Sequence, residues 1–148
     1  MNPFDLKSVL LARHAQHVVL IHFPIALFLV SVAFDFAAQW RRRAAFAAVA
    51  YYNLTVAAFA SIPAVATGLM AWYWQLEGQR IKGTLLLHLL LGLASTVLIW
   101  LVWLVHLRGR KPERTLPIYR WPLEIVAAAV VGLTAHLGGF LSGVNAGV

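Results

Sequence analysis

Four long apolar runs constrain the fold of this chain more than any other feature of its sequence. They cover roughly residues 17–39, 44–74, 84–107 and 121–141. Each reaches the roughly twenty residues that an α-helix needs to cross the hydrocarbon core of a bilayer. The connections between them are short, so successive helices should pack antiparallel. The sequence therefore predicts an all-α protein, an integral membrane antiparallel four-helix bundle, as a single domain over residues 1–148.

The composition indicates a membrane protein as well. Hydrophobic residues make up 61% of the chain and charged residues 11%, and the mean hydropathy is +0.78. Soluble domains are roughly half apolar and a quarter charged. The formal net charge of +7 would favour nucleic acid in a soluble chain. Here the basic residues lie between the apolar runs, where topology and anionic headgroups account for them. We therefore expect a lipid bilayer, and no nucleic acid, as a partner.

The chain has no cysteine, which limits the cofactors that it can hold. Thiolate zinc sites, iron–sulfur clusters and covalently attached haem are excluded, so a metal ion or a haem would need histidine or oxygen ligands. The sequence also lacks a phosphate-binding glycine loop and any arrangement of residues that supports hydrolysis. These absences favour a redox subunit over a stand-alone enzyme.

The distribution of basic residues predicts the orientation in the membrane. An even number of helices places both termini on one side, which carries Lys7, Arg13, Arg80 and Lys82, while the opposite side carries eight basic residues. The positive-inside rule makes the more basic side cytoplasmic. We therefore expect a multi-pass protein of the bacterial inner (cytoplasmic) membrane with both termini exoplasmic.

Four histidines are predicted near the exoplasmic face. At a rise of ~1.5 Å per residue, His17 lies at the membrane boundary and His22 lies ~7–8 Å deeper. His88 is about one turn into the third helix, and His136 is near the exoplasmic end of the fourth. Ionisable residues at membrane depth are costly and usually functional. His22, His88 and His136 are therefore candidate ligands of a metal ion or a haem, and the alternatives are interhelical hydrogen bonds, a proton relay or quinone contact.

Small residues beside these histidines favour a large, flat ligand. Residues four apart share a helix face, and Ala26, Gly92 and Gly132 lie four positions from His22, His88 and His136 respectively. Such bare surfaces would admit haem b, although ordinary packing of small residues is the alternative. Arg13, Arg80 and Lys82 lie on the same side and are candidate partners of the haem propionates. A compact zinc or copper site on His22, His88 and His136 is the smaller alternative.

The remaining polar residues suggest simpler roles. Asp35 should form an interfacial ion pair with the arginines at 41–43, and His106 should lie at the cytoplasmic interface. Pro24 lacks an amide hydrogen, so the first helix should kink beside His22. Two roles stay open for this kink: aiming the imidazole, or a simple bend.

Three segments resemble a known family. HVVLIHFPIALFLVSVAFD, His17 to Asp35, resembles the H-P-x-x-V-H-F-P-I-A opening of the bacterial membrane family called domain of unknown function 2231. TGLMAWYW, Thr67 to Trp74, is similar to its T-G-L/I-x-x-W segment, and AHLGGFLSGVNAGV, Ala135 to Val148, is similar to its closing G-H-x-G-G-x-L-V-Y-x-x-G-x-G-V. The chain departs from the pattern at Val18, where the family has proline, and at Ser142-Gly143, where it has Val-Tyr.

The resemblance carries four histidines over to this chain, with three further residues beside them. These residues are His17, His22, His88 and His136, together with Asp35, Gly138 and Gly139. The resemblance also implies electron transfer, because some members are fused to, or encoded beside, Rieske and cytochrome proteins.

The hypothesis from the sequence is a membrane b-type cytochrome-like protein. Its haem b would be held by axial histidines near the exoplasmic face, with His22 paired to His88 or His136. His17 and His22 are ~140° apart around the helix and therefore do not ligate one iron together. Electrons would pass between quinol or a membrane complex and a soluble redox carrier. The alternatives are a cofactor-free accessory subunit of a larger respiratory or photosynthetic complex, and the zinc or copper site.

Overall fold

The computed structural model describes residues 13–75, 80–109 and 116–142, and all regular structure in these ranges is α-helical. The helices are α2 (Arg13–Arg41), α3 (Ala44–Gln75), α4 (Gly83–Gly109) and α5 (Arg120–Leu141). Every bound falls within four residues of the predicted one. All four helices are long and apolar enough to cross a membrane. The described part of the chain is thus all-α, with four helices that could span a membrane.

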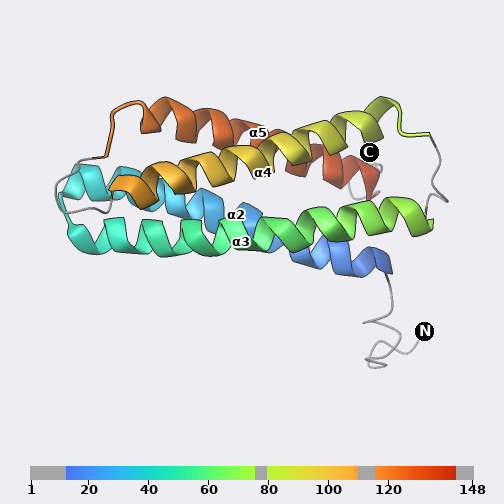
Figure 1. The fold of residues 1–148 in the computed structure, drawn as a ribbon, viewed down its shortest axis with the longest axis horizontal. Coiled ribbons are helices and arrows are strands. Elements are labelled where there is room, and N and C mark those ends of the chain that lie inside the picture. The colour runs from blue at the N-terminus through green and yellow to red at the C-terminus, as the bar shows by residue number, and fades with distance from the viewer. Residues whose placement is uncertain (1–12, 76–79, 110–115, 143–148) are drawn as a thin grey trace, which may run out of the picture.

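The four helices form an antiparallel bundle (Figure 1). The most extensive packing joins α2 to α3 and α4 to α5, and these two hairpins meet through α3 with α4 and α2 with α5. α2 and α4 therefore lie diagonally opposite each other. We call the end where α2 and α4 begin the histidine end, at the right of Figure 1, and the opposite end the carboxylate end.

The connection between α2 and α3 is a tight helix stop made by two arginines. Arg42 has a φ of 51°, and the Arg43 amide donates to the Ala38 carbonyl at 3.3 Å. A left-handed residue followed by this backward hydrogen bond is the Schellman ending of a helix. Inside the helices, Pro24 and Pro63 do not end α2 or α3, because both helices continue through them.

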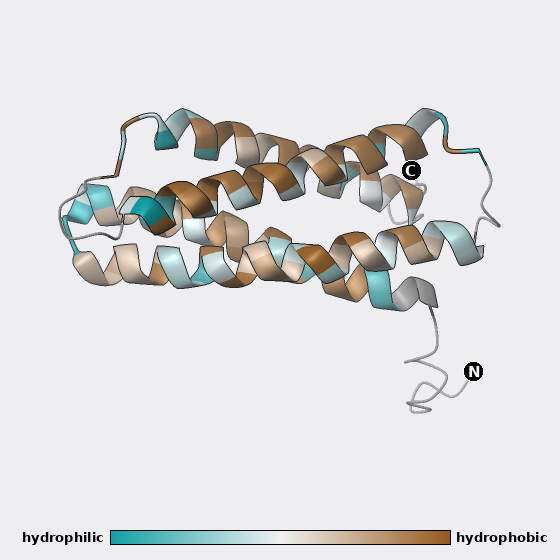
Figure 2. Ribbon diagram, in the orientation of Figure 1, coloured by the Kyte–Doolittle hydropathy of each residue, from teal (hydrophilic) through white to brown (hydrophobic). Residues whose placement is uncertain are grey.

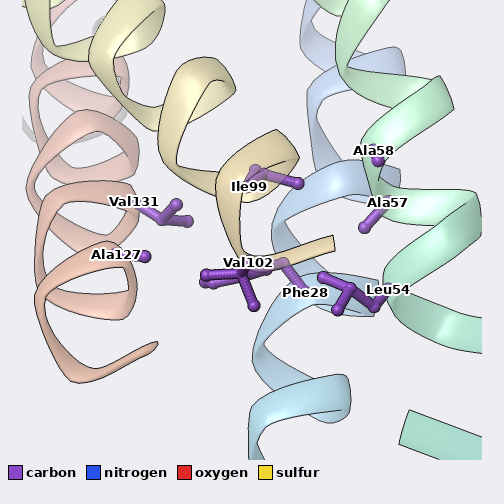
Figure 3. Packing of buried hydrophobic residues seen from close by; sticks show 8 residues of the cluster. All are labelled: Phe28, Leu54, Ala57, Ala58, Ile99, Val102, Ala127 and Val131. Atoms are coloured by element: carbon purple, nitrogen blue, oxygen red, sulfur yellow. The ribbon is translucent and has the colours of Figure 1, made fainter. Parts of the chain in front are cut away.

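Buried positions recur along each helix at alternating spacings of four and three residues. This spacing keeps one seam of a helix against its neighbours, as in coiled-coil packing. The apolar part of the core gathers residues from all four helices (Figure 3). These residues are Phe28, Leu54, Ala57, Ala58, Ile99, Val102, Ala127 and Val131.

The buried core does not extend along the whole bundle. Going towards the histidine end, the last buried residues are Pro24 on α2, Ala64 on α3, Ser95 on α4 and Val131 on α5. Beyond them, no described side chain is buried. Fully buried side chains therefore occupy the carboxylate end and the middle of the bundle, whereas the described side chains nearest the histidine end are only partly buried or exposed.

The outer surface of the bundle is apolar. Large hydrophobic side chains such as Val56, Leu90 and Val97 are more than half exposed. Hydrophobic residues continue along the helices, and hydrophilic ones lie mostly towards the two ends of the bundle (Figure 2). A surface of this size and composition needs lipid rather than water around it.

Candidate functional site

Each hairpin carries a half-buried histidine near the start of its first helix. His17 Nδ1 lies 3.2 Å from Thr67 Oγ1 of α3, and His88 Nδ1 lies 3.1 Å from the Thr134 carbonyl oxygen of α5. The two hairpins thus repeat one arrangement, in which a histidine is held by a threonine of the following helix.

Both histidines continue the buried seams of their helices. His17 lies seven residues before the buried Pro24, and His88 lies seven before the buried Ser95. Asp35 and His106 belong to one buried cluster and therefore lie at the same depth in the bundle. His17 precedes Asp35 by eighteen residues, and His88 precedes His106 by eighteen residues. Because α2 and α4 run in the same direction, His17 and His88 also lie at nearly one depth, ~27 Å from that cluster at the rise of an α-helix.

The hydrogen bonds fix the tautomer of both neutral rings. A carbonyl oxygen only accepts, so His88 Nδ1 carries the proton. The Thr67 hydroxyl donates to the Pro63 carbonyl at 2.8 Å, so its oxygen accepts from His17 Nδ1. In both rings Nε2 is therefore the nitrogen with the lone pair, which is the form that ligates metals.

Two glycines provide the surfaces against which these rings rest. A Cβ atom built on Gly68 would lie 2.9 Å from His17 Cε1, and one built on Gly138 would lie 3.2 Å from His88 Cε1. Gly92 faces the Thr134 methyl group at 3.9 Å, and the nearest space around Gly132 is open. The glycines in contact with imidazoles are thus Gly68 and Gly138, each on the neighbouring helix of its hairpin.

His22 and His136 lie on exposed faces of α2 and α5. His22 Nδ1 donates to the Val18 carbonyl of its own helix at 2.6 Å, and the His136 ring packs edge-on against Phe140 with centroids 5.0 Å apart. A metal centre on His22, His88 and His136, or a haem held by these residues, stays a prediction.

The predicted propionate partners lie partly within the described ranges. Arg80 and Lys82 are exposed in the connection that precedes α4, at the histidine end. The side chain of Arg13 lies outside the described residues.

A second group of polar residues is buried at the carboxylate end. Asp35 accepts a hydrogen bond from Arg120 Nε at 2.9 Å, and His106 Nε2 lies 2.8 Å from Glu124 Oε1. The exposed fractions of these four residues range from 1% for Glu124 to 7% for Arg120. Three helices supply them: α2, α4 and α5.

These contacts correct two expectations. Asp35 pairs with Arg120, 85 residues away, rather than with the exposed arginines at 41–43. His106 is buried in the bundle rather than placed at the interface, because Glu124 of α5 reaches it. The sequence analysis did not consider Glu124. The signal available was the pair Arg120 and Glu124, one helical turn apart, inside an apolar run.

The fold and these buried groups define the class of the protein: a multi-pass α-helical membrane protein with ionisable residues inside its bundle. The chain belongs to the family described as "Predicted membrane protein (DUF2231)", which matches residues 13–146, in agreement with the resemblance of its motifs. No curated protein and no solved structure matches the chain.

Proposed function

We propose that this chain is a b-type cytochrome-like electron-transfer protein of the bacterial inner membrane, with haem b held between His17 and His88. One observation carries the proposal. Two core-facing histidines lie at nearly one depth on diagonal helices, beyond the last buried residues of the bundle, where every described side chain is partly or fully exposed. Two imidazoles from facing helices are the ligand set of many membrane haems.

The residues present fit a flat cofactor. The His17 ring packs closely against Gly68, and the His88 ring packs closely against Gly138. These contacts with the neighbouring helices fix the positions of the two rings. The Nδ1 hydrogen bonds to α3 and α5 orient the rings, and in this tautomer Nε2 would be the ligand atom. A macrocycle would add the apolar contacts that this half lacks.

When bound, haem b supplies one-electron chemistry, and the chain supplies its surroundings. Thr67 and the Thr134 carbonyl hold the ring tautomers, which raises the basicity of Nε2. Arg80 and Lys82 provide positive charge at the same end for the propionates. With this end exoplasmic, as the positive-inside rule predicts, electrons would pass between quinol or a membrane complex and a soluble carrier.

Absorption spectroscopy tests the proposal. Protein purified from haem-replete cells should show a Soret band, and a reduced α band after dithionite. His17→Ala and His88→Ala should each abolish or strongly shift these bands. The matched controls His22→Ala and His136→Ala remove exposed histidines of the same helices and should leave the bands unchanged.

The opposite results would contradict the proposal at different points. Folded wild-type protein without haem bands would exclude the cytochrome. Loss of the bands in His22→Ala or His136→Ala, but not in His17→Ala, would move the axial ligands to the outward histidines. Elemental analysis for zinc and copper would then test the smaller metal site.

A second candidate is a cofactor-free accessory subunit of a larger respiratory or photosynthetic complex. It is favoured by His22, an exposed polar ring at membrane depth, where lipid alone offers no hydrogen-bond partner. Native mass spectrometry of gently solubilised membranes tests it. A haem-free complex that dissociates in His22→Leu supports an accessory role, and a haem-loaded lone chain contradicts it.

A further inference from the structure

The buried group at the carboxylate end is separate from the proposed haem site. One donor atom each from Asp35, His106 and Glu124 lies within 4.8 Å of the other two, and all three residues are buried. Among the residues that the structure describes, no other set of three such donors comes this close together. Three helices therefore bring two carboxylates and one imidazole to a single point in the bundle.

One atom of this group lacks a partner. Glu124 Oε1 is bonded to His106, but Glu124 Oε2 is fully buried with no hydrogen-bond donor in reach. A buried carboxylate oxygen without a partner is costly, because it has lost its water and gained nothing in return. A proton on Glu124 would remove the charge but would not give this oxygen a partner among the described residues. A cation would satisfy it.

We propose that Asp35, His106 and Glu124 form a binding site for a first-row divalent transition-metal ion. Imidazole together with carboxylate suits zinc, manganese and iron, whereas magnesium prefers oxygen alone. Three protein ligands leave one tetrahedral position for a small ligand such as water. Arg120 is a positioning residue, because its bond to Oδ2 holds the Asp35 carboxylate in place as outer-shell partners of metal ligands do.

The charge balance predicts what happens on binding. The carboxylates of Asp35 and Glu124 and the guanidinium of Arg120 sum to a charge of −1, which attracts a divalent cation. Metal ligands must be deprotonated, so an ion competes with protons for the same lone pairs. Binding should therefore release protons and tighten as the pH rises.

Cobalt is a suitable probe, because it replaces zinc and has visible d–d bands in a tetrahedral site. Chelator-treated, detergent-solubilised full-length protein should bind one Co²⁺ ion per chain, gain these bands and release protons to a pH indicator. Zn²⁺ should displace the cobalt and remove the colour.

Variants locate the ion. Glu124→Gln keeps the size of the side chain, and His106→Phe keeps a ring in the core; both should lose the bands. Arg120→Lys should weaken binding about 10- to 100-fold, the usual effect of an outer-shell change. The control His136→Ala removes an exposed histidine at the opposite end and should bind as the wild type does. Circular dichroism verifies that each variant is folded.

Two results would overturn the proposal. If folded wild-type protein takes up no Co²⁺ or Zn²⁺, the buried group is a hydrogen-bonded ion-pair network that binds no metal. Uptake that persists in Glu124→Gln and His106→Phe but disappears in His136→Ala would place the ion at the histidine end. Neither result depends on whether the protein binds haem.

Discussion

The two ends of the bundle differ in how they handle polar side chains. At the carboxylate end, four ionisable residues are buried and pair with each other across three helices. At the histidine end, the imidazoles are half-buried or exposed, and their hydrogen bonds go to a threonine hydroxyl or to main-chain carbonyls. The buried ionisable groups at the carboxylate end stabilise one another's charges. The hydrogen bonds at the histidine end set the orientation of the imidazole rings. We therefore expect the paired residues at the carboxylate end to contribute more to the stability of the bundle than the histidines at the other end.

Removing one charge from the carboxylate end should have the largest effect on stability. Arg120→Ala leaves the Asp35 carboxylate buried without its partner, and breaking a buried pair in this way costs about 3–5 kcal/mol. The double variant Asp35→Leu/Arg120→Leu removes both charges and should recover most of that loss. Unfolding in mixed micelles, followed by tryptophan fluorescence, measures both values. Equal losses in the single and double variants would mean that Asp35 does not depend on Arg120.

The same measurement on His17→Leu tests the other half of the comparison. Interhelical hydrogen bonds in membrane proteins contribute roughly 0.6 kcal/mol on average. A loss of that size in haem-free protein is expected at His17. A loss as large as that of Arg120→Ala would show that the histidine end also stabilises the bundle.

The bounds of the helices could be predicted from the sequence because the thickness of the bilayer sets the length of each apolar run. The faces of the helices that point into the bundle could not be predicted in the same way. A transmembrane helix is apolar on its lipid side and on its packed side, so hydropathy carries little information about direction. Only polar residues mark the interior, and the spacing of Ser31 and Asp35 on α2, or of Arg120 and Glu124 on α5, was the available signal.

Which polar residues pair with each other could not be predicted from the sequence, for a different reason. His17 and His22 are both near the start of α2, and only the seam through Pro24 and Phe28 shows that His17 is the one that faces the core. Asp35 lies close in sequence to three arginines but pairs with Arg120, because the register between α2 and α5 depends on the packing of the whole bundle. The spacing of residues within one helix does not determine the register between two helices.

Two glycines at the histidine end should respond to alanine with opposite signs. At Gly68 the new Cβ would lie 2.9 Å from the His17 ring, so the ring must move, and overpacking of this kind costs about 1–3 kcal/mol. At Gly92 the new Cβ meets only the Thr134 methyl at 3.9 Å, and the helix gains about 0.5–1 kcal/mol from the better residue. Thermal unfolding of both variants measures the difference. A stabilising Gly68→Ala would mean that the ring is free to move aside.

Two threonine variants should separate the roles of the histidine bonds. Thr67→Val removes the hydroxyl that orients His17 and should weaken haem binding about 10- to 100-fold, as the loss of an outer-shell partner does. Thr134→Val keeps the main-chain carbonyl that His88 uses, so haem binding should not change. It loses the two bonds of the Thr134 hydroxyl, to Ser95 and to the Val130 carbonyl. Haem titration of the two proteins measures both affinities. Equal weakening in both variants would contradict the tautomer assignment of the two rings.

A small effect on stability is expected at the turn that closes the carboxylate end. Arg42 has a left-handed backbone, which costs a residue with a Cβ atom roughly 1 kcal/mol relative to glycine. Arg42→Gly should therefore stabilise the bundle, by about 1 kcal/mol or less, because glycine also has more freedom to lose on folding. Arg43→Gly is the matched control, since it removes the same charge from the same connection at a residue whose φ is not positive. It should be neutral or destabilising in the same unfolding assay. If both variants are equally stabilised, the gain comes from reduced repulsion among the clustered arginines rather than from relief of the backbone at Arg42.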